Sequence, residues 1–139
     1  MTILRFAIPF VIAATLGCAA PPEPRVGATD AVVELDAFSG LPNPRWVLSK
    51  ADALELAGRL RGLSPAVTTQ PPPGILGFRG FRIHNPGGDA GIPEHVYISH
   101  DGVVMVGSEP GDAKYYRDDG GARQWLTADA RKRGYDGVF

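Results

Sequence analysis

Glycine and proline interrupt this chain so often that they restrict it to short elements of secondary structure. The 139 residues include 18 glycines and 13 prolines. Glycine weakens helices and strands through its conformational entropy, and proline fixes φ and removes a backbone donor. This share lies above that of an ordinary domain and below that of a low-complexity or collagen-like chain. The sequence therefore predicts short elements joined by many turns.

Length and charge exclude two classes of protein. A chain of this size allows one domain with a tail, and is too short for a nucleotide-binding unit followed by a substrate domain. Its 14 basic and 15 acidic residues leave a net charge of −1. Such a balance supplies no positive field that would attract a phosphate backbone. We therefore expect neither a two-domain enzyme nor a nucleic-acid partner.

The N-terminus has the pattern of a secretory signal. Arg5 precedes an uncharged apolar run that covers residues 6–16. This run is too short to span about 30 Å of hydrocarbon at about 1.5 Å per residue, so it predicts a signal-peptide core rather than a membrane helix.

The apolar run ends in Thr15-Leu16-Gly17-Cys18, which contains the only cysteine. This stretch resembles the lipobox of bacterial lipoprotein precursors, with Thr15 where Leu is commonest. The resemblance implies that residues 1–17 are a cleaved signal peptide and that Cys18 carries fatty acyl chains such as palmitate. Ala19 follows the cysteine, which in that family permits sorting to the outer membrane. We therefore expect a lipid-anchored protein of the bacterial cell envelope, in the outer membrane where there is one.

Two other roles for Cys18 are a buried structural thiol and a catalytic nucleophile that recruits a histidine. Its position between an apolar run and a proline-rich stretch favours lipidation. Each acyl CH₂ contributes about 0.8 kcal/mol to anchoring, so two or three chains would hold the protein on a bilayer. Without any other cysteine, the mature chain has no internal disulfide, thiolate metal site or thiol nucleophile.

The mature chain divides into a spacer at residues 18–30 and a single domain at residues 31–139. Three prolines favour an extended spacer, and Pro71 to Pro73 predict a rigid loop within the domain. Strands are predicted at residues 31–37, 75–83, 95–100 and 103–106, with a further extended piece at 113–117. Gly77 and Gly80 predict a bulge or a close backbone approach. Asp101-Gly102 predicts a type I′ hairpin turn.

Two segments have helical periodicity. Ser49 is predicted to cap the first helix, with Asp52 in the capping box. The apolar stripe of this helix comprises Leu54, Leu56, Ala57, Leu60 and Leu63. A shorter C-terminal helix is predicted at residues 122–133, with Gly134 just beyond its end. Strands and helices do not alternate regularly, so we predict an α+β domain: an antiparallel sheet of at least three strands, one long amphipathic helix and a short C-terminal helix.

The three histidines predict no shared metal site. His95 and His100 differ by five residues and should point to opposite faces of one strand. His84, beside Asn85 and Pro86, is predicted to lie in a loop. Asp118-Asp119 adjoin two glycines, which is a turn composition. Because the sequence also lacks the motifs of a nucleophile elbow, a phosphate loop or a zinc protease, we expect no cofactor and no metal.

Two unusual segments are Phe-Ser-Gly-Leu-Pro-Asn-Pro-Arg-Trp at residues 38–46, predicted as a turn, and Leu-Gly-Phe-Arg-Gly-Phe at residues 76–81. They resemble a pair of signatures in small proteins of uncharacterised function, which implies no particular activity. In an architectural interpretation the prolines shape a corner, Trp46 fills the core and Arg79 satisfies buried carbonyls. In a functional interpretation Asn43, Arg45, Trp46 and Arg79 form a recognition site.

The leading hypothesis is a non-catalytic, membrane-anchored lipoprotein that binds another envelope protein or an anionic or glycan ligand. One alternative is a cell-envelope hydrolase that uses Asp or Glu with His, and another is an inhibitor-like periplasmic protein. A cleft in which His95 or His100 bonds a carboxylate would favour the hydrolase. An exposed patch of aromatic and arginine side chains would favour the binding protein.

Overall fold

The computed structural model describes residue 27 and residues 29–68, 75–108 and 111–139. The predicted signal peptide, the lipobox with Cys18 and most of the spacer lie outside these ranges. So do the three prolines at residues 71–73.

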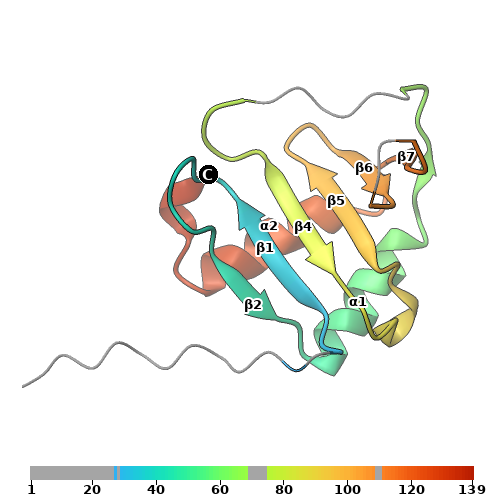
Figure 1. The fold of residues 1–139 in the computed structure, drawn as a ribbon, viewed down its shortest axis with the longest axis horizontal. Helices are drawn as coiled ribbons and strands as arrows, with labels where there is room; N and C mark the ends of the chain where they lie inside the picture. The colour runs from blue at the N-terminus through green and yellow to red at the C-terminus, as the bar shows by residue number, and fades with distance from the viewer. Residues whose placement is uncertain (1–26, 28, 69–74, 109–110) are drawn as a thin grey trace, which may run out of the picture.

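The described residues form one antiparallel sheet with two helices on one face (Figure 1). The strand order is β2-β1-β4-β5-β6-β7-β3. The strands are β1 (Val32–Asp36), β2 (Arg45–Val47), β3 (Ser64–Pro65), β4 (Gly80–His84), β5 (His95–Ser99), β6 (Val103–Val106) and β7 (Lys114–Arg117). The helices are α1 (Lys50–Leu60) and α2 (Ala122–Lys132), with 3-10 turns η1 (Asp89–Gly91) and η2 (Asp136–Val138). The α+β class predicted from the sequence is confirmed.

The core lies between the sheet and the two helices. In Figure 1 α2 crosses behind β1, β4 and β5, and it also contacts α1. Alternate strand residues point toward the helices, because successive side chains of a strand face opposite ways. The larger buried members of this layer include Val33, Leu35, Phe81, Ile83, Val96, Ile98, Val104, Leu56 and Leu126. The intervening residues of each strand therefore face away from the helices.

The helix boundaries follow the local signals in the sequence. The Ser49 hydroxyl accepts a hydrogen bond from the Asp52 N–H at 3.1 Å, as a capping residue should. Gly134 follows the last turn of α2, where its N–H donates to the Arg131 carbonyl at 2.9 Å. The predicted stripe is wrong at Leu54, which is 53% exposed, because the buried side of α1 is centred on Ala53, Leu56 and Ala57.

Four local predictions are corrected by the structure. The strand predicted at residues 75–83 begins only at Gly80. Arg45 and Trp46 belong to strand β2 rather than to a turn, since β2 pairs with β1 at the edge of the sheet. His84 is the last residue of β4 rather than a loop residue. The turn at Asp101-Gly102 is not type I′, which requires positive φ at both residues, whereas only Gly102 has it.

The turn at Asp101-Gly102 differs from type I′ because the backbone and side chain of Ser99 make the hydrogen bonds that close it. The Gly102 N–H donates to the Ser99 carbonyl at 3.1 Å, and the Ser99 hydroxyl accepts from the Val103 N–H at 2.9 Å. The same hydroxyl donates to the Asp101 carboxylate, and this bond lowers the pKa of Asp101.

Candidate functional site

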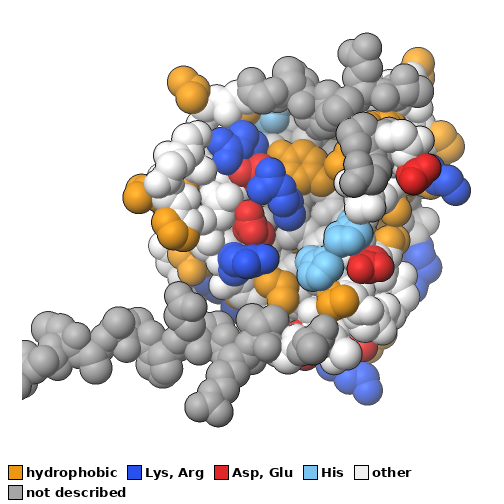
Figure 2. Space-filling view, viewed as in Figure 1, with side chains coloured by type: hydrophobic (Ala, Val, Ile, Leu, Met, Phe, Trp, Pro, Cys, Tyr) orange, Lys and Arg blue, Asp and Glu red, His pale blue; other side chains and the backbone are white. Residues whose placement is uncertain are grey.

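A row of side chains, all but one of them polar, crosses the sheet on the face turned away from the helices. Glu34 lies opposite Arg45 on one neighbouring strand and opposite Arg82 on the other. Arg82 in turn lies opposite Tyr97, and Tyr97 lies opposite Met105. Five strands, β2, β1, β4, β5 and β6, each supply one residue of this row. We call this surface the open face; Figure 2 shows its charged side chains gathered near the centre of the view.

The charged side chains of the open face form an alternating chain of ion pairs. Asp36 is only 1% exposed and accepts from Arg79 Nε at 2.8 Å. Its second oxygen lies 2.7 Å from Arg82 Nη2. Arg82 Nη1 reaches Glu34 at 3.1 Å, and Glu34 also pairs with Arg45 Nε at 3.2 Å. Three guanidinium groups therefore meet two carboxylates, which leaves one positive charge in excess.

Arg79 joins the start of β4 to the loop that follows β1. Its backbone N–H donates to the Asp36 carbonyl at 2.8 Å, and its guanidinium reaches Ser39 Oγ at 3.1 Å and the Phe38 carbonyl at 3.2 Å. The hydrogen bond to Asp36 raises the pKa of Arg79 above its usual value. Because its donors are engaged by the protein, Arg79 positions Asp36 rather than offering a free guanidinium.

A hollow of about 560 Å³ lies over the open face. Tyr97 lines it, and its hydroxyl donates to the Arg79 carbonyl at 3.0 Å. Burial, aided by the negative charge of Asp36, raises the pKa of Tyr97 against the opposing effect of Arg82 and Arg79, so the phenol stays protonated at neutral pH. The Arg82 guanidinium lies 5.7 Å from the centre of the Tyr97 ring. The hollow thus combines arginine donors with an aromatic surface.

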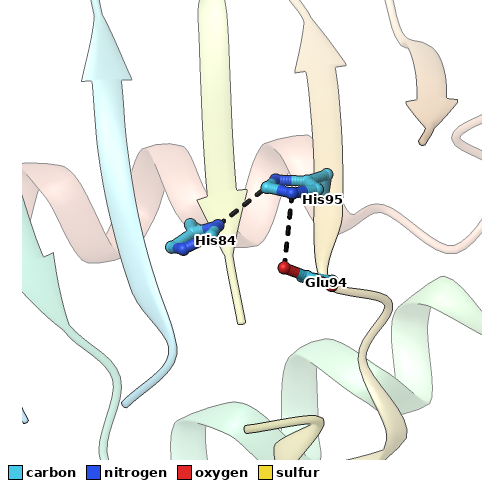
Figure 3. A group of neighbouring side chains, drawn as sticks. All are labelled: His84, Glu94 and His95. Atoms are coloured by element: carbon cyan, nitrogen blue, oxygen red, sulfur yellow. Dashed lines mark hydrogen bonds and ion pairs between the residues drawn. The ribbon is translucent and has the colours of Figure 1, made fainter. Parts of the chain in front are cut away.

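Two histidines line the hollow beside this charged row. His84 and His95 are directly opposite each other on β4 and β5, and their rings stack with centres 4.8 Å apart. Their Nδ1 atoms are 3.2 Å apart. Glu94 Oε1 lies 3.5 Å from His95 Nε2, and Figure 3 shows the three side chains together.

Sequence reasoning missed this group because it compared His95 with His100 along one strand. The pair instead forms between strands, since His84 ends β4 and His95 begins β5. Each histidine adjoins a buried residue, Ile83 or Val96, that points toward the helices. Extending the predicted strand at 75–83 by one residue and pairing it antiparallel with the strand at 95–100 would have brought the two histidines onto one face.

Three of the four residues predicted to form a recognition site lie together on the open face. Asn43 Oδ1 accepts from the N–H groups of Ala37 at 3.1 Å and Phe38 at 2.9 Å, and its Nδ2 donates to Glu34 at 3.1 Å. Arg45 pairs with Glu34, and Arg79 pairs with Asp36.

The structure places Trp46, the fourth residue, on the opposite side of the sheet. Trp46 is 4% exposed and its ring stacks on Tyr135 at 6.0 Å. The Arg133 guanidinium lies 5.3 Å from the same ring. Arg45 and Trp46 are adjacent residues of β2, so their side chains must point to opposite faces. The open face instead includes Glu34, Asp36, Arg82, Tyr97 and His84, which the sequence analysis did not single out as site residues.

The neighbouring carboxylates Asp118 and Asp119 have structural partners. The two oxygens of Asp118 accept from the Ala122 N–H at 2.8 Å and the Arg123 N–H at 2.7 Å. They therefore satisfy backbone donors in the first turn of α2. Asp119 accepts a hydrogen bond from the Ser64 hydroxyl.

No protein-family model, curated protein or solved structure matches this chain. Over the part of the chain that the structure describes, no helix has both the length and the apolar character needed to cross a membrane. The function is therefore inferred from the chemistry of the side chains themselves.

Proposed function

We propose that this protein is a lipid-anchored, non-catalytic binding protein of the bacterial cell envelope, and that the hollow on its open face binds a small anionic ligand. The anchor is supported by the N-terminal apolar run and its lipobox at Cys18. The ligand class is supported by one observation above all, the excess of guanidinium over carboxylate groups around the hollow.

Arg45 and Arg82 are the arginines best placed to receive such a ligand. Their side chains are 62% and 53% exposed, whereas that of Arg79 is 23% exposed. Arg45 pairs with Glu34 through Nε, and no hydrogen bond or ion pair from its terminal nitrogens is found among the described residues. A guanidinium has five donors in a planar fork that matches a carboxylate or phosphate. Tyr97 supplies an apolar surface for the rest of a small ligand.

This proposal predicts that Arg45→Ala and Arg82→Ala each weaken anion binding by about 10- to 100-fold. Hydrogen bonds to charged groups contribute about 1.5–3 kcal/mol, and about 1.4 kcal/mol corresponds to tenfold in affinity. The full chain in detergent would be titrated with phosphate, citrate and an oligogalacturonate, with binding followed by calorimetry.

The matched control is Arg123→Ala, which removes the same charge from an exposed position on α2. It should bind the anions as the unaltered protein does. Equal binding by all three variants, or no binding of any of the anions to the unaltered protein, would contradict an anion site in this hollow. If no anion binds, a pull-down from envelope extract would test for a protein partner instead. A protein recovered with the unaltered chain but not with Arg45→Ala would be that partner.

The anchor predicts that Cys18→Ser abolishes incorporation of labelled palmitate and leaves the precursor uncleaved. A thioether bond to the lipid needs the thiol, and a serine hydroxyl does not replace it. Labelling in cells followed by electrophoresis would measure both effects, with Ala20→Ser as a control that keeps Cys18. Palmitate that still enters the Cys18→Ser protein would show that Cys18 is not the modified residue.

The hydrolase alternative has one observation in its favour, the approach of His95 to Glu94 beside the hollow. Their separation of 3.5 Å exceeds the usual length of a hydrogen bond, about 2.7–3.2 Å. The Glu94 side chain is also 62% exposed. A carboxylate this exposed interacts only weakly with the imidazole, and the excess of arginine around the hollow favours binding over hydrolysis.

A further inference from the structure

We propose that His84, His95 and Glu94 bind one divalent transition-metal ion, for which zinc is the best fit, at the edge of the hollow. One ligand atom from each of the three residues lies within 4.8 Å of the others. The site goes beyond the proposed anion-binding function and does not depend on it, because neither Arg45 nor Arg82 takes part.

The spacing of the two imidazoles matches that of two ligands on one metal ion. Their Nδ1 atoms are 3.2 Å apart. Two Zn–N bonds of about 2.0–2.1 Å at a tetrahedral angle hold their nitrogens about 3.3 Å apart. This spacing therefore fits a shared ion once the two stacked rings turn so that both nitrogens point at it.

The protein fixes the two histidines at this spacing before any metal arrives. They are paired residues of adjacent strands, so their Cβ atoms are held close on one face. The Asn85 N–H donates to the Glu94 carbonyl at 2.8 Å, directly beyond this pair. The buried Asn85 side chain also donates to the Ile92 carbonyl at 2.8 Å, which holds the connecting loop against the ends of β4 and β5. Donor groups on such rigid elements bind a metal with little loss of conformational freedom.

Glu94 provides the third donor. Its exposed carboxylate lies 3.5 Å from His95 Nε2, and its side chain has to rotate toward the two Nδ1 atoms to bring an oxygen to the ion. Two imidazoles and one carboxylate form a set in which zinc keeps a position for water or for another ligand. Because His84 and His95 both line the hollow, that position would face the space proposed to receive an anion.

The donor set also selects the kind of metal. Imidazole nitrogens suit zinc, copper and nickel, whereas calcium and magnesium prefer oxygen ligands. The group has two imidazoles and a single carboxylate. Calcium and magnesium should therefore bind far more weakly than zinc.

The experiment is a calorimetric titration of the full chain in detergent with Zn²⁺, repeated with Mg²⁺ and Ca²⁺. We expect one Zn²⁺ per chain and no heat from Mg²⁺ or Ca²⁺. His84→Ala and His95→Ala should each weaken zinc binding at least tenfold, and Glu94→Gln should weaken it by less than either. His84→Phe keeps a ring that can stack on His95 but removes the nitrogen donors, so it should also lose the metal while keeping the circular dichroism spectrum of the fold.

The third histidine provides the matched control. His100 lies in the turn after β5, at the other end of that strand from His95, so His100→Ala should bind zinc as tightly as the unaltered protein. Substitution with Co²⁺ should produce visible absorption bands that His84→Phe lacks. The proposal is overturned if the unaltered protein does not bind zinc, if His84→Phe binds it normally, or if His100→Ala weakens binding as much as His95→Ala.

Discussion

Replacing Gly80 with alanine should lower the melting temperature of this protein by at least about 10 °C. A Cβ at Gly80 would lie 2.3 Å from the Ile98 carbonyl oxygen of the neighbouring strand. Gly80 also has a φ of +153°, which side chains disfavour. Overpacking costs about 1–3 kcal/mol and a strained backbone residue a similar amount, while 1 kcal/mol shifts the melting temperature of a domain near this size by about 4–8 °C. Thermal unfolding followed by circular dichroism measures the effect.

Gly77→Ala is the matched control for that substitution. Gly77 also has positive φ, at +83°, but within the described part of the chain no atom outside its own neighbours lies within 4 Å of a Cβ built there. Its replacement should therefore incur the conformational strain alone and lower the melting temperature by less. Equal losses for the two variants would show that the close approach of β4 to β5 is not what requires glycine at residue 80.

Trp46→Ala should reduce the free energy of unfolding by about 3–5 kcal/mol. Trp46 is buried beneath the sheet, where it contacts Tyr135 and Arg133, and its removal leaves a large cavity. Trp46→Phe keeps most of the apolar volume and removes an indole N–H that has no partner among the described residues, so its loss should be smaller. Urea unfolding of the two variants measures the difference.

The same variants test whether Trp46 acts in recognition. Under conditions where it remains folded, Trp46→Phe should bind anions and zinc as the unaltered protein does, because Trp46 lies on the opposite face from Arg45. Trp125→Ala, at a half-buried position of α2, provides a comparison and should destabilise less than Trp46→Ala. Selective loss of ligand binding in Trp46→Phe would show that Trp46 serves the site after all.

Elements with strong local signals were predictable from the sequence. Helix α1 begins at the predicted cap Ser49, and strands β5 and β6 flank the predicted turn at Asp101-Gly102. Strand β2 was missed because it has three residues and directly follows Pro44, which suggests a turn. Its pairing with β1 is a tertiary contact that overrides this local preference.

The site was less predictable because strand pairing assembles it. Arg79 and Asp36 are 43 residues apart in sequence, and their ion pair forms only when β1 lies beside β4. His84 and His95 likewise meet through the register of two strands. Trp46 attracted attention as an aromatic next to Arg45, but adjacent strand residues face opposite ways. Residue type therefore indicated candidate site residues, whereas the pairing register of the strands determined which of them share a surface.

The two outer strands of the sheet matter for the proposed membrane anchor. Attachment to a bilayer would hold neighbouring molecules at a high local concentration, where exposed strand edges can pair from one molecule to the next. Here the outermost strands are β2, with three residues, and β3, with two residues that include Pro65. A short edge with a proline or with the charged Arg45 gives a neighbour little backbone to pair with. These short edge strands therefore favour molecules that stay separate over molecules whose sheets join edge to edge.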